Sequence, residues 1–498
     1  MPPERTHPRP TESHSEQAVL DDVPKQLLIG GRWRDGEHGS TLDVEDPSTG
    51  ETIAQVADAG EADALDALGA AHEAFAAWRE TAPRERGEIL RRAYEAMIEQ
   101  AGELALLMTL EMGKTVAESR AEVTYAAEFL RWFSEEAVRI DGRYTTHQAG
   151  AGRLLTMKQP VGPCVLITPW NFPLAMGTRK IGPAIAAGCT MVVKPAKLTP
   201  LSMLALARIL ERAGLPGGVL NVITSSSSGR VMEPLIRDPR TRKLSFTGST
   251  EVGRRLMEQA SEQLLRVSME LGGNAPFLVF EDADLDDALD GAMVAKMRNI
   301  GEACTAANRF HVHASLAEDF ARGMAQRMGA LEIGRGSDDG VDVGPLIDEE
   351  QLAKVQELVD DALQRGATLL CGGERVDGPG HFYKPTVLSD VPAGARLLRE
   401  EIFGPVAPVR SFDSEEQALT EANDTQFGLV AYLYTNDLAR ALRVSERLET
   451  GMVGLNQGVV SNAGAPFGGV GHSGFGREGG REGIEEYLET KYVALAKP

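Results

Sequence analysis

The sequence lacks three features that would each assign it to a broad class of proteins. It has no excess of positive charge, because 51 Lys and Arg residues stand against 73 Asp and Glu residues and give a formal charge of −22. This balance argues against a nucleic-acid partner. It has no run of apolar residues near the ~20 needed to span a bilayer, so no membrane partner is expected.

Closely spaced cysteines are also missing. The four cysteines are scattered and form no CxxC pair: Cys164, Cys189, Cys304 and Cys371. No metal-binding spacing is present, so no metal site is predicted. Free thiols are typical of a reducing compartment, and we therefore expect a cytoplasmic protein.

Length and composition predict a soluble protein with more than one domain. A chain of 498 residues, with 42% hydrophobic and 25% charged residues, is too long for a single core. Residues 1–20 are rich in Pro, Glu, Ser and His and contain no apolar segment of the kind found in secretion signals. They are predicted to form a disordered tail.

Strand-like and helix-like segments alternate along the chain. After a helical stretch over 61–140, short apolar runs that favour buried strands occur at 161–168, 190–193, 219–223 and 243–246. Helical patterns lie between or after them, at 201–213 and 250–260. A second α/β series covers about 274–455. Such alternation predicts doubly wound parallel sheets with ligands bound at the carboxyl ends of strands.

One apparent nucleotide-binding motif is misleading. The segment Gly474-Phe475-Gly476-Arg477-Glu478-Gly479 fits the GxGxxG pattern, but no strand leads into it and charged residues follow. The pattern has little meaning outside a strand–turn–helix context. A mobile or tightly turning loop is the better interpretation, and no Walker-type phosphate loop is present either.

Cys304 and Glu270 are the strongest candidates for chemistry. Each lies in or beside a glycine-containing turn: Cys304 in Gly301-Glu302-Ala303-Cys304, and Glu270 in Glu270-Leu271-Gly272-Gly273. A thiol and a carboxylate in such turns favour covalent catalysis, in which sulfur attacks and the carboxylate moves protons. The plain alternative is a small buried hydrophobic residue and a carboxylate at a helix end.

Three polar residues follow predicted strands, where active-site groups gather. The amide of Asn171 can donate to a developing oxyanion, although an Asn in a turn bounded by prolines is often structural. The ammonium of Lys194 can meet ribose or phosphate, or else solvent. Ser249 begins a predicted helix, where it either marks a phosphate site or is an ordinary N-cap.

With these residues in place, the chain resembles the NAD(P)-dependent aldehyde dehydrogenases over about residues 25–495. The resemblance rests on seven motifs in the family's order: Pro169-Trp170-Asn171-Phe172-Pro173, Lys194-Pro195, Phe246-Thr247-Gly248-Ser249, Glu270-Leu271-Gly272-Gly273, Gly301 to Cys304, Glu401-Ile402-Phe403-Gly404-Pro405 and Pro466-Phe467-Gly468-Gly469. One such motif would be weak, but seven in order are specific.

The resemblance implies a role for each matching residue. It implies that Cys304 attacks an aldehyde, that Asn171 and the Cys304 main-chain N–H hold the oxyanion, and that Glu270 activates water to release the acid. The residues implied to bind the cofactor are Lys194 and Glu401 at the riboses, Ser249 at the pyrophosphate, and Trp170 and Phe403.

The family's architecture also implies domain boundaries. A cofactor-binding domain is expected at 21–139 and 161–270, a catalytic domain at 271–465, and a small β element for oligomerisation at 140–160 and 480–498. The resemblance therefore implies an α/β, aldehyde-dehydrogenase-like fold of doubly wound parallel sheets. It also implies a homodimer or homotetramer acting on a small aldehyde.

Lys197 bears on the choice of cofactor. NAD-preferring relatives often carry Glu at this position, where it binds the 2′-hydroxyl of the adenosine ribose. A cation in place of that carboxylate favours a 2′-phosphate. The resemblance therefore favours NADP over NAD, unless Lys197 points to solvent.

The substrate is indicated by Arg179, Arg298 and Ser461. These positions resemble the carboxylate-binding residues of succinate-semialdehyde dehydrogenases, and Arg forms charge-assisted, often bidentate bonds to carboxylates. Without the resemblance, each arginine would be assigned to a surface or inter-domain salt bridge. Some relatives carry a second Cys two places after the nucleophile. Here that position is Ala306, so a disulfide there is impossible.

Other functions fit less well. A cofactor-independent Cys hydrolase would need a histidine, and His311 and His313 are expected on the solvent-facing side of a strand. A catalytically silent binding protein would have no need of Asn171, Glu270 and Cys304. A CoA-dependent acylating enzyme is disfavoured by Glu270, which suits hydrolysis. A different or broader range of aldehydes remains the main alternative to succinate semialdehyde.

We predict that Lys197→Glu weakens NADP far more than NAD, because a carboxylate would then face the 2′-phosphate. Dissociation constants for both cofactors, measured by fluorescence titration, test this. Equal changes for the two cofactors would place Lys197 away from the ribose.

Overall fold

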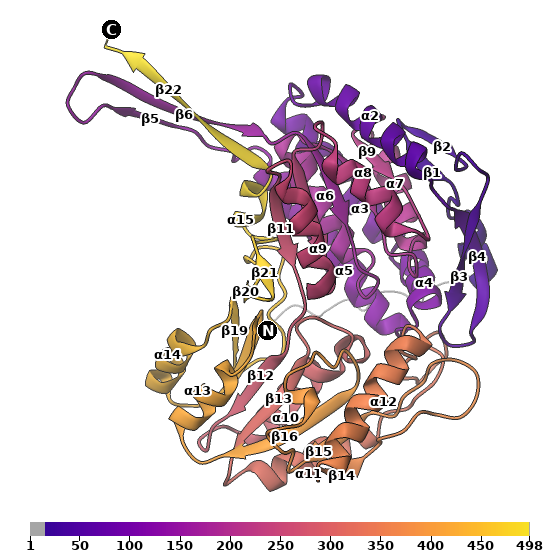
Figure 1. Ribbon diagram of the computed structural model, residues 1–498, viewed down its shortest axis with the longest axis vertical. Coiled ribbons are helices and arrows are strands. Elements are labelled where there is room, and N and C mark those ends of the chain that lie inside the picture. The colour runs from indigo at the N-terminus through magenta and orange to yellow at the C-terminus, as the bar shows by residue number, and fades with distance from the viewer. Residues whose placement is uncertain (1–14, 498) are drawn as a thin grey trace, which may run out of the picture.

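The computed structural model describes residues 15–497, which form two α/β units and a narrow antiparallel arm (Figure 1). In Figure 1, β11 of the first unit runs towards β12 of the second, so the chain passes directly from one sheet to the other. The segment between them is Leu271 to Asn274. The two sheets are thus joined at the place where Glu270 ends a strand.

The first unit is built on an eight-stranded sheet with parallel central strands and antiparallel edges. Because the strands at its centre, β7, β8 and β10, are buried along their whole length, both faces are covered by helices. The parallel strands follow the doubly wound order, with the reversal between β7 and β10. The strands in spatial order are β2 (Arg32–Arg34), β1 (Leu27–Ile29), β9 (Leu220–Val222), β8 (Thr190–Lys194), β7 (Pro163–Ile167), β10 (Lys243–Thr247), β11 (Arg266–Glu270) and β21 (Gly474–Phe475).

Helices cover both faces of this sheet, as the alternation of the sequence predicts. The stretch 61–140 is helical as expected, and Gly113, with φ 93°, ends the third of its four helices. One face of the sheet packs against α2, α8 and α9, and the other against α3 to α7. The helices are α2 (Glu61–Trp78), α3 (Pro83–Glu99), α4 (Ala101–Met112), α5 (Val116–Glu136), α6 (Ala175–Ala187), α7 (Leu201–Arg212), α8 (Ser228–Arg237) and α9 (Thr250–Ser261).

The second unit has a seven-stranded sheet that is parallel except at β14. Its strands in spatial order are β14 (Thr368–Cys371), β15 (Thr386–Ser389), β16 (Val406–Phe412), β13 (Ala307–His313), β12 (Ala275–Val279), β18 (Val430–Tyr434) and β19 (Met452–Leu455). Its helices are α10 (Leu285–Met297), α11 (Ala317–Gly329), α12 (Glu349–Gln364), α13 (Glu415–Asn423) and α14 (Leu438–Arg447), with 3-10 turns η1 (Arg298–Gly301) and η2 (Arg396–Leu398). The predicted second α/β series is therefore confirmed.

An arm of three antiparallel strands projects from the first unit (Figure 1). It consists of β5 (Arg143–Thr146), β6 (Gly152–Pro160) and β22 (Leu488–Ala496), and β22 follows the short helix α15 (Glu482–Glu485). Strand β22 pairs with β6 from Leu488 opposite Pro160 to Ala496 opposite Gly152. Two further hairpin-like sheets pair β3 (Thr41–Asp46) with β4 (Glu51–Ala57), and β17 (Phe427–Gly428) with β20 (Val470–Gly471).

The prediction of a disordered tail over 1–20 is wrong for its last residues. Helix α1 (Glu16–Asp22) begins at the N-cap Ser15, whose hydroxyl accepts from the N–H of Ala18. It buries Val19 and Leu20, and its carboxylate Glu16 pairs with Arg335. The composition of the tail as a whole masked this short apolar pattern. Residues 1–14 lie outside the described residues.

The segment with the GxGxxG pattern turns tightly, as expected, and is no dinucleotide fingerprint. Its glycines adopt left-handed φ values of 103°, 90° and 71° at Gly474, Gly476 and Gly479. A Cβ at Gly474 would lie 1.9 Å from the carbonyl oxygen of Met269, because β21 runs against β11 there. Separately, no helix within residues 15–497 is both long and apolar enough to cross a membrane.

We predict that Leu20→Ala lowers the free energy of unfolding by about 2 kcal/mol, because it removes buried apolar contacts between α1 and the first unit. Urea denaturation of both proteins measures the difference. Gln17→Ala on the exposed side of the same helix is the matched control, with a change within ~0.5 kcal/mol. Equal effects of the two substitutions would show that Leu20 makes no stabilising apolar contacts with the core of the first unit.

Candidate active site

The site lies where the two sheets meet. Strands of the first sheet end there with their carboxyl termini, followed or closed by Trp170, Asn171, Lys194, Ser249 and Glu270. The second sheet contributes the segments that lead into its strands, with Cys304 before β13 and with Glu401 and Phe403 before β16. Ligands of open α/β sheets bind at such edges.

Residues 298–304, which we call the nucleophile loop after the predicted nucleophile Cys304, have a strained backbone. Three successive residues adopt left-handed φ values, 55° at Asn299, 62° at Ile300 and 78° at Gly301. A Cβ at Gly301 would lie 2.3 Å from the carbonyl oxygen of Gly404, so only glycine fits there. Strain of this kind persists where the surroundings hold it, and it concentrates at functional sites. Here it delivers Cys304 to the junction in a half-buried position.

Gly272 and Gly273, which follow Glu270, allow this segment to lie in close contact with Cys304 and Glu401. A Cβ at Gly273 would lie 2.4 Å from the carbonyl oxygen of Cys304, and one at Gly272 would lie 2.8 Å from Oε2 of Glu401. Without side chains, this segment can lie in contact with both. The main-chain N–H of Gly273 also donates to Oε1 of Glu401 over 2.9 Å. The motif containing Glu270 is therefore fixed next to Cys304.

Burial raises the pKa of the Cys304 thiol to about 12. The nearby cation Arg179 lowers this pKa, Glu270 and Glu401 raise it, and Arg298 lowers it by less than Arg179. The sulfur therefore carries its proton at neutral pH in the free protein. Reaction requires a group that removes the proton or stabilises the thiolate.

Asn171 is fixed by bonds to the nucleophile loop. Its Nδ2 donates to the carbonyl oxygen of Glu302 over 2.9 Å, and the residue is 4% exposed. Its own carbonyl oxygen accepts from Nζ of Lys114 at 2.8 Å and from Nδ2 of Asn299 at 3.1 Å. A primary amide has two N–H groups. One of them remains to donate to an oxyanion beside Cys304.

Lys114 and Glu122 support this arrangement and were not predicted from the sequence. They form a fully buried ion pair with an Nζ–Oε2 distance of 2.5 Å. The other carboxylate oxygen of Glu122 accepts from the first N–H groups of the segment that opens α6, at Leu174 and Ala175. In the sequence, both residues have the appearance of ordinary helix-surface charges. Only the packing of α5 against α6 shows that they are inside.

Glu270 is buried and its Oε2 has no hydrogen-bond partner among the described residues. Burial raises its pKa well above the usual value for Glu, and the negative charge of Glu478 raises it further. Arg179 and Lys180 act in the opposite direction. A carboxyl group whose pKa is raised in this way holds a proton more readily than an ordinary glutamate, which suits a group that moves protons in hydrolysis.

Arg179 is neutralised by an internal carboxylate. Its Nε lies 2.6 Å from Oε2 of Glu478, and its guanidinium stacks over the ring of Phe467 with Cζ 4.0 Å from the centroid. Lys180 pairs with the other oxygen of Glu478. Glu478 belongs to the glycine motif at 474–479, and no pattern in the sequence predicts this role. Arg179 thus lies near Cys304, and its positive charge is already balanced by the carboxylate of Glu478.

Arg298 and Ser461 lie in contact with each other. Nη1 of Arg298 donates to Oγ of Ser461 over 3.3 Å. The guanidinium lies over the ring of Phe172, with Cζ 4.9 Å from its centroid. Ser461 also lines a cavity of about 390 Å³ between α5 and the loop before β20. The three residues proposed for substrate binding are therefore split, with Arg298 and Ser461 joined and Arg179 paired elsewhere.

The predicted cofactor residues come from both units: Lys194 ends β8, Ser249 precedes α9, and Glu401 and Phe403 precede β16. Lys194 is buried, and its pKa is lowered to about 8 by burial and by the nearby charge of Lys197, which is exposed. Ser249 caps α9 with an Oγ that accepts from the N–H of Val252. The rings of Trp170 and Phe403 meet edge to face, with centroids 5.3 Å apart.

These residues suit a dinucleotide. A cation pair at the end of β8 suits a phosphorylated ribose, and the N-terminus of α9 suits a pyrophosphate. Phe403 holds a left-handed φ of 55°, an uncommon conformation for an aromatic residue at a functional position.

The expectation that His311 faces solvent is wrong. Its side chain is 2% exposed and Nδ1 lies 3.2 Å from Oε2 of Glu421, because helices cover both faces of this central strand. Burial lowers the pKa of His311. It lies on β13 beyond Ala307, and four residues of strand span about 13 Å, so it is no partner for Cys304. His313 is half-buried and bonds to Ser315.

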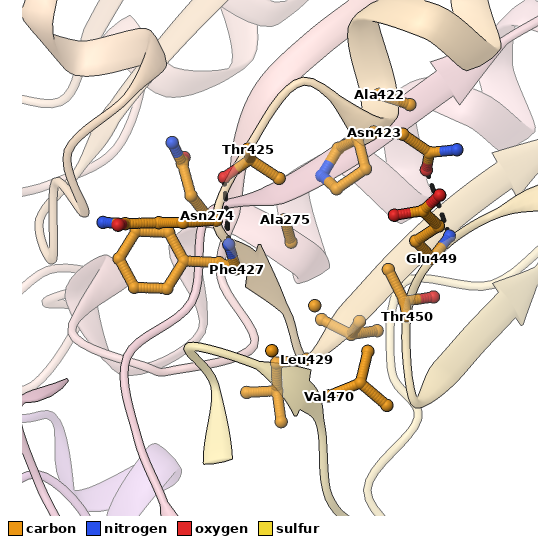
Figure 2. A pocket seen from close by; sticks show the side chains of 15 residues that line it. Asn274, Ala275, Ala422, Asn423, Thr425, Phe427, Leu429, Glu449, Thr450 and Val470 are labelled. Carbon is orange, nitrogen blue, oxygen red and sulfur yellow. Dashed lines mark hydrogen bonds between the residues drawn. The ribbon is translucent and has the colours of Figure 1, made fainter. Parts of the chain in front are cut away.

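A separate pocket of about 140 Å³ lies at the start of β12 and β18 (Figure 2). Asn274, Phe427 and Leu429 line it, and Figure 2 shows Asn423 bonded to the main-chain N–H of Glu449. Its lining contains one carboxylate and no cationic side chain. It is therefore unsuited to the phosphates of a dinucleotide. Within residues 15–497, no group of three or more His, Cys, Asp or Glu side chains is arranged to hold a metal.

Known proteins resemble the chain over nearly its whole length. The model of the aldehyde dehydrogenase family matches residues 33–493. A succinate-semialdehyde dehydrogenase of Paenarthrobacter nicotinovorans is 59% identical over 90% of this chain and 99% of its own length. A glutarate-semialdehyde dehydrogenase of Pseudomonas putida is 50% identical over 95% of this chain and 98% of its own.

The structure agrees with these relationships. The crystal structure of an NADP-dependent enzyme of Escherichia coli matches with a TM-score of 0.94 at 50% identity, over 95% of this chain and 98% of that one. The chain therefore belongs to the aldehyde dehydrogenase family. The family and the fold class predicted from the sequence are both confirmed.

We predict that alkylation of Cys304 by iodoacetamide in the free protein accelerates steadily from pH 7 to pH 10, because its raised pKa keeps the thiolate scarce below that range. Peptide mapping by mass spectrometry assigns the modified cysteine, and Cys304→Ser serves as the control. A plateau below pH 9 would show that the thiolate already forms at neutral pH.

Proposed function

We propose that this protein oxidises succinate semialdehyde to succinate, with NADP as the hydride acceptor. The observation that carries the substrate assignment is the Arg298–Ser461 pair, in which a cation with no carboxylate partner among the described residues donates to a hydroxyl. An aldehyde that bears a carboxylate can bind there while its carbonyl reaches Cys304. The name of the relative in Paenarthrobacter nicotinovorans supports the same substrate.

The residues of the site provide each chemical step. The Cys304 thiol gives its proton to a base, for which Glu270 is the candidate and which returns the proton to solvent. The sulfur then bonds to the aldehyde carbon, and the carbonyl oxygen becomes an oxyanion that accepts from the second N–H of the Asn171 amide and the main-chain N–H of Cys304. The bound cofactor supplies a hydride acceptor. Loss of hydride from the carbon leaves a thioester on Cys304.

Release of the product depends on Glu270. Its carboxylate accepts a proton from a water molecule, whose oxygen attacks the thioester carbon, and the carbon–sulfur bond breaks to give the acid. The raised pKa of Glu270 suits it to hold a proton after this step. Burial is the main cause of that raised pKa; the charge of Glu478 raises it further, and Arg179 and Lys180 lower it.

The cofactor assignment rests on two cations. Lys197 lies close enough to Lys194, at the end of β8, for its charge to lower the pKa of Lys194, and a 2′-phosphate would relieve the repulsion between the two cations. A plain ribose hydroxyl would not. The NADP-dependent enzyme of Escherichia coli, which has the same fold, supports this choice.

The wider organisation is also part of the proposal. Residues 21–139 and 161–270 would form the cofactor-binding domain, and residues 271–465 the catalytic domain. The projecting β5, β6 and β22 leave strand edges free within the described residues, and a second copy of the chain can cover such edges in a dimer or tetramer. Four free cysteines fit a cytoplasmic location.

A second candidate substrate is glutarate semialdehyde, favoured by the relative in Pseudomonas putida. It carries the same two groups with one more methylene between them, and one methylene is worth only about 1–3 kcal/mol in a pocket. A cofactor-independent hydrolase is not favoured, because it would give Lys194, Ser249 and Glu401 no role. A broad aldehyde range would leave the Arg298–Ser461 pair without a ligand.

The test is to follow reduced cofactor with succinate semialdehyde, glutarate semialdehyde and butanal, each with NADP and with NAD. We predict that Arg298→Ala raises KM for succinate semialdehyde about 30-fold or more, because losing a buried charge partner costs roughly 2–5 kcal/mol. Butanal should be nearly unaffected. Arg322→Ala, at an exposed site on α11, is the control.

Two outcomes would contradict the proposal. Equal losses for succinate semialdehyde and butanal would make Arg298 a scaffold residue and leave a general aldehyde dehydrogenase. A wild-type protein that shows no preference for either semialdehyde over butanal would remove the substrate assignment itself.

A further inference from the structure

Tyr125 presents a buried hydroxyl that has no hydrogen-bond partner among the described residues. It lies on α5 and lines the 390 Å³ cavity together with Ser461. Buried tyrosine hydroxyls are nearly always bonded, and an unmet donor costs about 1–3 kcal/mol. A group left unbonded beside a cavity points to a ligand that completes it.

Two aromatic rings of α5 lie near the two arginines of the site. Cζ of Arg298 is 5.7 Å from the centroid of Tyr125. The ring of Phe129 meets that of Tyr125 edge to face at 5.0 Å, and Cζ of Arg179 is 5.5 Å from the centroid of Phe129. Tyr125 and Phe129 lie one turn apart on α5, so they form one aromatic surface under both guanidinium groups.

The charges beside this hydroxyl also indicate what it can bind. Burial lowers the pKa of Arg179, while Tyr125 and then Glu478 raise it above its usual value, so the hydroxyl lies close to that guanidinium. Arg179 is already paired with Glu478. Arg298 has no carboxylate within ion-pair distance in the described part of the chain, and it bonds only to the Ser461 hydroxyl. The free positive charge therefore lies on the Arg298 side of Tyr125.

A carboxylate fits this set of donors better than any neutral group. It offers about four acceptor positions, and an arginine together with one serine hydroxyl leaves at least one of them unfilled. A tyrosine O–H can fill that position with a charge-assisted bond. A neutral alkyl end would leave both the hydroxyl and Arg298 unsatisfied.

We propose that the Tyr125 hydroxyl donates to the distal carboxylate of the substrate, so that Tyr125 is a specificity-determining residue beside Arg298 and Ser461. This inference rests on the proposed oxidation of a carboxylate-bearing aldehyde. The Tyr125 hydroxyl would add a neutral hydrogen-bond donor to those of Arg298 and Ser461. The chemical class it selects is an aldehyde that ends in an anionic group.

The experiment compares Tyr125→Phe with the wild-type protein on succinate semialdehyde and on butanal. We expect KM for succinate semialdehyde to rise about tenfold, equal to about 1.4 kcal/mol, with kcat within about twofold. Butanal should show unchanged constants. The inhibition constant of succinate, which presents the same carboxylate without the aldehyde, should rise by a similar factor.

Stability provides a readout that a packing role would not give. Because Tyr125→Phe removes an unbonded buried hydroxyl and keeps the ring, its melting temperature should be unchanged or higher. The matched control is Tyr383→Phe, at a tyrosine buried in the core of the second unit away from this cavity, which should leave both KM values unchanged. Should Tyr125→Phe fail to fold, Tyr125→Met provides a second apolar variant for the same comparison.

The outcomes separate this inference from the function beneath it. A wild-type preference for succinate semialdehyde that survives unchanged in Tyr125→Phe would overturn the inference and leave the proposed function intact. Equal losses on both aldehydes would make Tyr125 a packing residue and also overturn it. A wild-type protein without any preference for the carboxylate would overturn both.

Discussion

The main-chain carbonyl oxygen of Asn171 is the point on which the site depends. It accepts from Lys114, which belongs to the helical layer of the first unit, and from Asn299, which belongs to the nucleophile loop of the second. Asn299 and the Asn171 side chain both donate to the carbonyl of Glu302. Two sheets with separate cores are therefore held in register at the atoms that surround the sulfur. In a covalent mechanism, small displacements of such groups reduce the rate strongly.

The buried charges of this protein follow one rule. Most charged side chains near the junction have an opposite charge or a main-chain donor: Lys114 has Glu122, Arg179 and Lys180 share Glu478, and the N–H of Gly273 bonds to Glu401. Isolated burial of such groups would be costly. Pairing fixes their positions, whereas Oε2 of Glu270 has no partner among the described residues and burial is the main cause of the raised pKa values of Glu270 and Cys304. Arg298, with only a hydroxyl as partner, departs from this rule at the place proposed for an anionic substrate.

The sequence alone predicted the fold class, the central strands of the first sheet and the residues of the motifs. It did so because buried parallel strands are short apolar runs and because the motif residues follow them directly. His311 was misplaced because alternation along a strand gives opposite faces but cannot show that both are covered. Lys114, Glu122 and Glu478 were missed because a charged residue in a helix or loop has the same pattern whether it is exposed or buried. Tyr125, for which a role is proposed, was not singled out because an aromatic residue on a helix usually packs in a core. Tyr383 in the core of the second unit also has an unpartnered hydroxyl, and Tyr125 differs from it by lining a cavity together with Ser461.

The arm and the last edge strand have a consequence for how the chain folds. Strand β6, near the end of the first third of the sequence, pairs along its length with β22 at the carboxyl terminus, and β21 completes the edge of a sheet whose other strands precede Leu271. Neither pairing can form until almost the whole chain has left the ribosome. Contacts between residues so distant in sequence slow folding, since the entropy of closing the long loop is lost before the stabilising contacts form. During synthesis, the nascent first unit must therefore carry two unpaired strand edges, and chaperones that shield such edges would assist this protein more than one built from local contacts.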